Sequence, residues 1–260
     1  FLTKFSLYLL FIPPLIYANS AFNKKLHLIL LIFTILIIGR FLFNGYIDGL
    51  IAIYFSFSIY IFYELIFEKK KNLTDYLILF CFLIILSLLK NEGFVLVLII
   101  LSLLLIENLN NKNKFIIDKN FFLCLSIVPY VLWKLITILN GIETDVLIDA
   151  KFERIKSYDI LINSLFLIFK ILFFNFQSLI SILVLVISFY FCKDKKLLNV
   201  TLYCVLFYIL VLILVYLGSS YELNWHLITS GPRVMMSIHY IVFLSSIAGL
   251  YKNYRFAYKG

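Results

Sequence analysis

The chain has 260 residues, of which 63% are hydrophobic and only 14% are charged. Together with a mean hydropathy of +1.04, this composition leaves too little polar surface to cover a water-soluble globular protein. The apolar residues come in unbroken blocks rather than in alternation, which excludes a membrane β-barrel. The net charge of +9 is a signal of membrane topology and not of nucleic-acid binding. We therefore predict an all-α, polytopic transmembrane helical bundle that forms a single domain over residues 1–260.

Nine apolar runs are candidate membrane spans, although several are shorter than the roughly 20 residues that cross a standard bilayer. Pro13 and Pro14 are expected to kink or split the first run, because proline lacks the backbone N–H that a helix needs. The nine runs cover residues 5–19, 27–43, 49–67, 75–89, 94–107, 120–139, 178–192, 198–217 and 240–251.

Basic residues are concentrated in one alternate set of the loops between these runs. The loops near residues 24, 70, 115 and 194, with the C-terminal segment, carry 14 basic and six acidic residues. The remaining segments carry nine basic and eight acidic residues. Because cytoplasmic loops are enriched in lysine and arginine, the first set is predicted to face the cytoplasm. The first residue of the chain then lies outside and the last residue inside.

The segment 159–176 is apolar but carries a polar stripe. Asn163, Lys170 and Gln177 recur every seven residues, and Asp159 falls near the same stripe, which places them on one face of a helix. Such a helix suits the membrane surface better than the membrane centre. We therefore predict an outward loop and an outer-interface helix over residues 140–177, leading into the span at 178–192.

Four short segments on the predicted outward side contain the candidate functional residues. Ionisable side chains in or beside a bilayer are costly, so they usually mark a site or a boundary. The four segments are residues 43–49 with Asp48, residues 90–93 with Lys90, Asn91 and Glu92, the charged loop 140–158, and residues 218–239 with Trp225, His226 and Arg233.

Each of these residues also has a purely structural explanation. Asp48 precedes a predicted helix, where a carboxylate stabilises the positive N-terminal end. Lys90 and Glu92 could pair with each other at the turn between two helices. Trp225 could be an ordinary interfacial anchor, and Arg233 could mark the turn into the last span. The convergence of carboxylates and cations on one side of the membrane favours a functional interpretation.

A site at the outer membrane boundary can accept a lipid whose phosphate lies at headgroup depth. Lys90 and Arg233 are candidates to hold that phosphate, arginine with its fork geometry and lysine as a point charge. A carboxylate could take a proton from an attacking hydroxyl or hold a divalent metal ion near the leaving phosphate. His226 is interpreted as a loop or helix-end residue rather than as a metal ligand.

Several short motifs, taken in order over roughly residues 40–250, resemble those of bacterial GT-C-type membrane glycosyltransferases. These enzymes are similar to the protein O-mannosyltransferases and to the aminoarabinose transferase of lipid A. The most specific motif is the stretch Leu89-Lys90-Asn91-Glu92-Gly93. The other motifs are Asn44-Gly45-Tyr46-Ile47-Asp48, Pro129-Tyr130-Val131-Leu132-Trp133-Lys134, and Trp225-His226 followed by Thr229-Ser230 and Arg233.

The resemblance implies an inverting transferase of the bacterial inner membrane. It would pass a sugar from a polyprenyl-phosphate donor to a glycan, lipid or protein acceptor on the extracytoplasmic side. GT-C enzymes carry an acidic residue in their first outward loop as the presumed base, and no such loop precedes Asn44, so we expect that loop upstream of Phe1.

The resemblance also suggests roles for individual residues. Asp48 and Glu92 are then the catalytic carboxylates of this chain, Asp48 in a supporting role. A divalent metal ion is a possible cofactor, with Glu92 and His226 as possible metal or acceptor contacts. The residues expected to bind phosphate or substrate are Lys90, Asn91, Arg233, Trp225 and His226.

Two other functions are compatible with the same outward residues. A carrier or flippase for a lipid-linked saccharide would use the same cations, but it would also need polar residues running through to both faces. Charges within the predicted spans are few, and Arg40 and Lys134 both lie toward the outer side. An O-antigen polymerase or ligase would carry an arginine-rich outward loop, whereas the loop 140–158 contains only Arg154.

Overall fold

The structure of the chain is a computed structural model that describes residues 9–43, 46–67, 73–110, 121–142 and 153–257. These residues form helices joined by short turns and contain no β-strand, which confirms the predicted all-α class. The α-helices are α2 (Ile12–Ala21), α3 (Lys24–Phe43), α4 (Asp48–Ile66), α5 (Leu73–Leu89), α6 (Asn91–Asn110), α8 (Val128–Leu139), α9 (Tyr158–Phe173), α10 (Phe176–Phe191), α11 (Lys196–Gly218) and α12 (Leu223–Ala257). The described part also contains two short 3-10 helices, η1 (Leu125–Ile127) and η2 (Glu153–Ile155).

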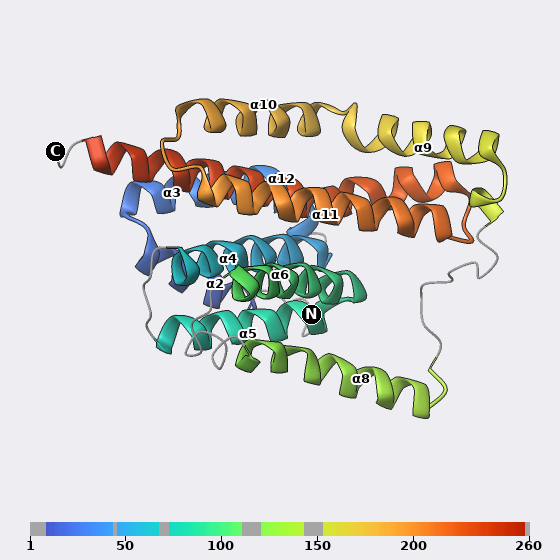
Figure 1. The fold of residues 1–260 in the computed structure, drawn as a ribbon, viewed down its shortest axis with the longest axis horizontal. Helices are drawn as coiled ribbons and strands as arrows, with labels where there is room; N and C mark the ends of the chain where they lie inside the picture. Colours follow the sequence, from blue (N-terminus) through green and yellow to red (C-terminus); the bar gives the residue numbers. More distant parts are fainter. Residues whose placement is uncertain (1–8, 44–45, 68–72, 111–120, 143–152, 258–260) are drawn as a thin grey trace.

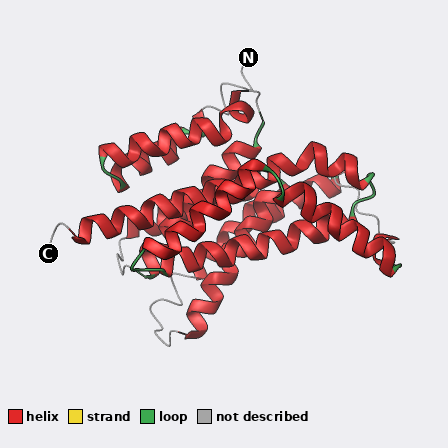
Figure 2. Ribbon diagram, turned by 90° about the horizontal axis from the view of Figure 1, so that it is seen from above, coloured by secondary structure: helices red, strands yellow, loops and turns green. Residues whose placement is uncertain are grey.

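The long helices lie side by side along the longest axis of the molecule (Figure 1). Helix α4 is at the centre, and every residue from Asp48 to Leu65 is buried. A helix that is apolar on all sides belongs in the middle of a bundle. Its most extensive contacts are with α12, followed by α5. Seen from above, the described residues are helical throughout, with short loops between the helices (Figure 2).

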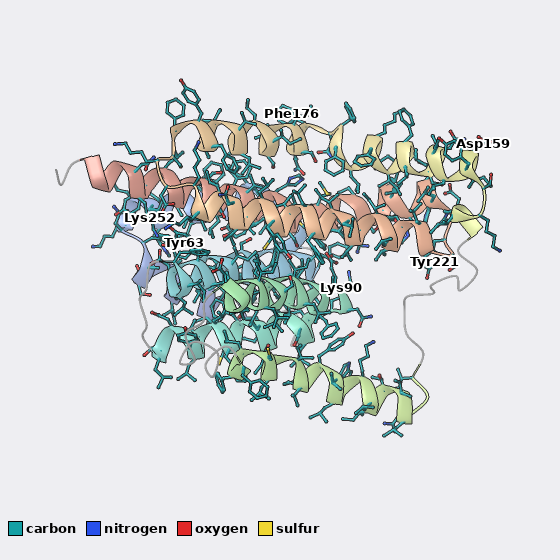
Figure 3. All side chains as sticks on the ribbon, in the orientation of Figure 1. Tyr63, Lys90, Asp159, Phe176, Tyr221 and Lys252 are labelled. Carbon is teal, nitrogen blue, oxygen red and sulfur yellow. The ribbon has the colours of Figure 1, made fainter. Side chains whose placement is uncertain are left out.

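The bundle has two ends that collect different helix termini (Figure 1). Helices α4, α6, α9 and α12 begin at one end, which we call the Lys90 end. Helices α3 and α11 begin at the other, which we call the Lys252 end (Figure 3). The helices therefore alternate in direction as a chain that crosses a membrane repeatedly would require.

Helix α10 has an inverted arrangement of polar and apolar residues. Its buried residues are Ser178, Ser181 and Ser188. Large apolar side chains such as Leu183 and Val186 are exposed on its outer side. In lipid, small residues let helices approach closely while apolar side chains face the acyl chains. Helix α8 has the same arrangement, because its exposed side is almost entirely apolar. These apolar surfaces are typical of a membrane protein.

The structure does not support the predicted number of nine spans. Among the described residues, four helices are long and apolar enough to cross a membrane, or five if a bent pair counts as one span. The bent pair is α9 and α10, whose axes differ by 75°. Two of the predicted runs are too short: α2 has ten residues, with the Pro13-Pro14 pair in its first turn, and α5 has 17 residues.

The outward segment predicted at 218–239 is wrong for most of its length. Helix α12 begins at Leu223 and continues without interruption through Pro232, so the short span predicted at 240–251 is only its second half. Proline interrupts one backbone hydrogen bond, but in a bundle neighbouring groups can satisfy the freed carbonyl. The Gly231-Pro232 pair, which the sequence pattern suggests is a turn, is part of the helix.

The helix predicted near residue 160 is present as α9. Its stripe residues Asn163 and Lys170 are exposed, and Ser164, Ile168 and Leu172 form the buried side. The helical periodicity inferred from the sequence is thus confirmed. The outward loop that precedes it lies partly outside the described residues, at 143–152.

Candidate functional site

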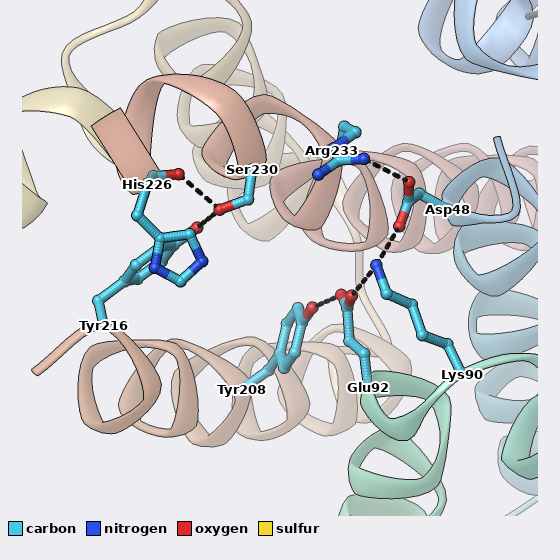
Figure 4. A network of polar contacts seen from close by, with 8 residues as sticks. All are labelled: Asp48, Lys90, Glu92, Tyr208, Tyr216, His226, Ser230 and Arg233. Atoms are coloured by element: carbon cyan, nitrogen blue, oxygen red, sulfur yellow. Dashed lines mark hydrogen bonds and ion pairs between the residues drawn. The ribbon is translucent and has the colours of Figure 1, made fainter. Parts of the chain in front are cut away.

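The predicted charged residues meet at the Lys90 end of the bundle (Figure 4). Asp48 lies in the first turn of α4, Lys90 lies between α5 and α6, and Glu92 lies in the first turn of α6. Arg233 reaches the same place from within α12, three turns after that helix begins. Three parts of the chain that are distant in sequence thus contribute to one cluster, which we call the ion cluster (Asp48, Lys90, Glu92 and Arg233).

Asp48 lies between the two cations of the cluster. Lys90 Nζ is 3.0 Å from Asp48 Oδ1, and a guanidinium nitrogen of Arg233 is 3.9 Å from Asp48 Oδ2. The Asp48 side chain is only 6% exposed, compared with 45% for Lys90 and 29% for Arg233. The Asp48 carboxylate therefore lies at the buried, inner side of the cluster. The two cations lie further out and are open to an approaching anion.

The one-residue connection between α5 and α6 sets the position of Lys90 and Glu92. Helix α5 ends at Leu89 and α6 begins at Asn91, so the chain reverses within Lys90 alone. A Cβ atom on Gly93 would lie 2.0 Å from the carbonyl oxygen of Leu86, a backbone atom that cannot move aside. Only glycine allows this close approach, which explains why the charged residues are followed by glycine.

Glu92 is the second carboxylate of the cluster. Its side chain is 14% exposed, and Lys90 Nζ lies 3.8 Å from its Oε2. The hydroxyl of Tyr208, in the middle of α11, donates a hydrogen bond to Glu92 Oε1. Burial raises the pKa of Glu92 above its ordinary value, while the Tyr208 hydrogen bond and Lys90 act in the opposite direction. A carboxylate with a raised pKa takes up a proton more readily than an exposed glutamate.

Tyr208 was missed by the sequence analysis. It is one of 18 tyrosines and lies within an apolar run, so its pattern does not differ from that of a residue packed in the core. Only the packing of α11 against α6 brings its hydroxyl to a carboxylate.

Arg233 is only partly engaged within the protein. Its guanidinium carbon is 5.3 Å from the centre of the Tyr46 ring, a cation–π distance. Its Nε is buried and has no hydrogen-bond partner. A buried donor without a partner is costly, and binding of an anion would satisfy it.

His226 lies beside the cluster but not within it. Its ring packs edge-on against Tyr216 at 4.9 Å, and its Nδ1 has no hydrogen-bond partner. The Tyr216 hydroxyl is 2.8 Å from Ser230 Oγ, and Ser230 donates to the carbonyl oxygen of His226 (Figure 4). These contacts connect the end of α11 to the first turns of α12.

Asn91 and Trp225 make contacts outside the ion cluster. Asn91 Oδ1 accepts a hydrogen bond of 2.9 Å from Tyr130, which also stacks on Phe94 and thereby attaches α8 to the α5–α6 turn. Trp225 is 55% exposed and packs against Tyr221 at the start of α12. The structure therefore does not bring either side chain to the ion cluster.

Arg154 is a second residue, after Tyr208, to which the sequence analysis assigned no structural role. From η2, its guanidinium donates to the carbonyl oxygens of Tyr216, Ser219 and Tyr221. These carbonyl groups lie in the last turn of α11 or just after it, where no backbone N–H of the helix is available to them. Arg154 thus fixes the α11–α12 turn above the site, and its charge is used within the protein.

The donor set does not fit a divalent metal ion. In the described part of the chain, no three histidine, cysteine, aspartate or glutamate side chains are grouped as metal ligands. An ammonium group, that of Lys90, lies between the carboxylates of Asp48 and Glu92. An arrangement of two acids around a cation, with a second cation adjacent, is suited to an anionic ligand instead.

Comparisons with known proteins add no identification. No protein-family model, no curated protein and no solved structure matches the chain. The ion cluster and the apolar bundle around it are therefore the basis of any functional proposal.

Proposed function

We propose that this chain is a membrane glycosyltransferase module that moves a sugar from a polyprenyl-phosphate donor to an acceptor. The observation that carries the proposal is the ion cluster, in which two carboxylates and two partly exposed cations meet at one end of an apolar bundle. A lipid-linked sugar has the matching chemistry, since its chain is apolar and its phosphate is an anion. The resemblance of the motifs to GT-C enzymes supports the same assignment.

The phosphate of the donor would replace Asp48 as the partner of the two cations. Lys90 is nearly half exposed, and Arg233 has an unused buried Nε, so both can turn to a ligand while remaining near Asp48. Asp48 then keeps the two cations oriented before the substrate arrives. Preorganised charges of this kind stabilise the negative charge that develops on a leaving phosphate.

Glu92 is the proton acceptor in this proposal. The acceptor hydroxyl attacks the anomeric carbon, its proton passes to Glu92, and the bond from that carbon to the phosphate oxygen breaks. The polyprenyl phosphate leaves with the bonding electrons and is held by Lys90 and Arg233. One displacement inverts the anomeric configuration.

The proposal places the ion cluster on the extracytoplasmic side of the bacterial inner membrane. Lysines gather at the opposite, Lys252 end, at the start of α3, after α10 and near the end of α12. The positive-inside rule assigns that end to the cytoplasm.

The test is sugar transfer by the full-length protein in membrane vesicles, with a polyprenyl-phosphate sugar as donor. We expect Lys90→Ala and Arg233→Ala to lower kcat/KM by roughly 10-fold to 100-fold, since a hydrogen bond to a charged group contributes about 1.5–3 kcal/mol. Glu92→Gln should abolish transfer at near-normal donor binding.

Lys170→Ala is the matched control, because Lys170 is an exposed lysine on α9 that no contact connects to the cluster. It should retain the activity of the unmodified protein. Wild-type turnover in Lys90→Ala and Arg233→Ala would contradict the assignment. Movement of the donor across the vesicle membrane without transfer would contradict it as well, and would favour a carrier.

A further inference from the structure

A second feature of the bundle is an open cavity between α10 and α11. Both helices pack against α12, but they make only slight contact with each other. The space left between them has a volume of about 160 Å³. We call it the α10–α11 slot. Its walls are Ser178, Ser181, Ile182 and Leu185 of α10 with Leu202, Val205 and Ile209 of α11, its floor is Met235, Ile238, His239 and Val242 of α12, and Phe173 closes one end.

The polar side chains of the slot are turned toward the protein. Ser178 Oγ donates to the carbonyl oxygen of Leu172 at 2.7 Å. Ser181 Oγ donates to the carbonyl oxygen of Gln177 at 2.9 Å and lies 2.9 Å from His239 Nδ1. These serine hydroxyls have therefore used their donors, and the remaining lining is aliphatic or aromatic. A cavity of about 150 Å³ with such a lining stays free of water and takes up apolar ligands.

The slot is continuous with the surface that faces lipid. Exposed apolar residues flank it on both walls, with Leu183 and Val186 beside it on α10 and Leu206 and Leu210 beside it on α11. Helices α11 and α12, which form one wall and the floor, are both candidate membrane spans. The medium at the mouth of the slot is therefore the acyl chains of the bilayer.

The slot is separate from the ion cluster. On α11, Tyr208 points to Glu92, whereas its neighbours along the helix Val205 and Ile209 line the slot. Helix α11 packs on α12 and so divides the two sites. A lipid whose phosphate is held by Lys90 and Arg233 cannot also place its chain here without passing between these helices.

From these observations we propose that one acyl chain of a membrane phospholipid binds in the α10–α11 slot. The floor runs from Met235 to Val242, a length of about 10 Å at 1.5 Å per helical residue. A linear hydrocarbon chain fills such a space lengthwise and adds to the slight contact between α10 and α11. The bound lipid then completes the bundle on the side where α9 and α10 meet at a sharp bend.

The first test uses the unmodified protein and a phospholipid that carries a photoreactive group in one acyl chain. After reconstitution and illumination, peptide mapping should locate the label on Leu185 and Leu202 in preference to Val186, which faces the bulk lipid. Labelling of Val186 equal to that of the slot residues would overturn the proposal. Preferential labelling of the slot by a photoreactive polyprenyl phosphate, and not by the phospholipid, would overturn it as well.

The second test compares two variants of adjacent residues by native mass spectrometry. Val205→Phe fills the slot, while Leu206→Phe adds the same ring to the lipid-facing side of the same helix. The unmodified protein and Leu206→Phe should retain one phospholipid after purification in mild detergent, and Val205→Phe should lose it. Retention by Val205→Phe, or no retained lipid in the unmodified protein, would refute the site.

Discussion

At the scale of single residues, the pair of Glu92 and Tyr208 determines how the proposed chemistry depends on pH. Glu92 must be ionised to accept a proton, so activity should fall as the pH drops through its pKa. Burial raises that pKa, and the hydrogen bond from Tyr208 lowers it. Tyr208→Phe removes only the hydroxyl, so the pKa of Glu92 should rise further. We expect the acidic limb of kcat/KM, measured over about pH 5 to 9, to move to higher pH.

Tyr203→Phe is the control for this experiment. Tyr203 is on the same helix, and its hydroxyl lies 3.4 Å from Ser102 Oγ rather than from an acid of the cluster. Its profile should coincide with that of the unmodified protein. An unchanged acidic limb in Tyr208→Phe would mean that Glu92 is not the group that titrates.

The charged members of the site could be found from the sequence because they stand out against their surroundings. Asp48, Lys90, Glu92 and Arg233 interrupt or border apolar runs, where an ionised group needs a partner. The structure supplies those partners within the cluster. Tyr208 could not be found in this way, because aromatic residues are common in apolar helices. Its hydrogen-bond partner depends on how the helices pack.

At the scale of helices, the turn between α5 and α6 depends on Gly93. A side chain there would collide with the backbone of Leu86, at 2.0 Å, and would force the two helices apart. Gly93→Ala should therefore destabilise the protein by about 1–3 kcal/mol, the range for overpacking a close contact. The measurement is resistance to unfolding by heat or denaturing detergent in reconstituted protein.

The matching control is Gly231→Ala on α12. The nearest atom to a Cβ at Gly231 is Leu172 Cδ2 at 3.1 Å, the movable end of a side chain, so the helices can adjust. This variant should lose much less stability than Gly93→Ala. Equal losses would show that the α5–α6 turn has more room than the structure gives it.

Helices were predictable from the sequence where a run is apolar and its ends are polar. The runs at 27–43, 49–67 and 75–89 became α3, α4 and α5 with ends shifted by at most three residues. The prediction failed at α12, because Gly231-Pro232 suggested a turn and the polar residues before it suggested a loop. Those polar residues are helical because α12 packs beside α9, α10 and α11, which no local pattern reveals.

At the scale of the whole molecule, α4 carries an ionic contact at each of its ends. Asp48 joins the ion cluster at the Lys90 end, and Glu64 pairs with Lys252 of α12 at the other end. Lys252 also lies 4.4 Å from the centre of the Tyr63 ring, and the Tyr63 hydroxyl donates to Asp194 at 3.2 Å. Between Asp48 and Glu64 the helix has no charged residue. The bundle thus has two polar ends separated by an apolar length, as expected for a protein with its ends at opposite membrane surfaces.

The bent pair of α9 and α10 allows this orientation to be tested directly. The pair begins at the Lys90 end and finishes at the Lys252 end (Figure 1), so it crosses the bundle once despite its bend of 75°. We expect a cysteine at Lys156, just before α9, to react with an impermeant maleimide in intact cells. A cysteine at Lys195, after α10, should react only once the membrane is opened, because the positive-inside rule assigns that loop to the cytoplasm.

Both lysines are exposed, so burial does not limit the reaction, and the unmodified chain measures background labelling of the four native cysteines. Labelling of both positions from one side would make the pair a re-entrant loop, and the reverse pattern would place the ion cluster in the cytoplasm, away from an extracytoplasmic acceptor.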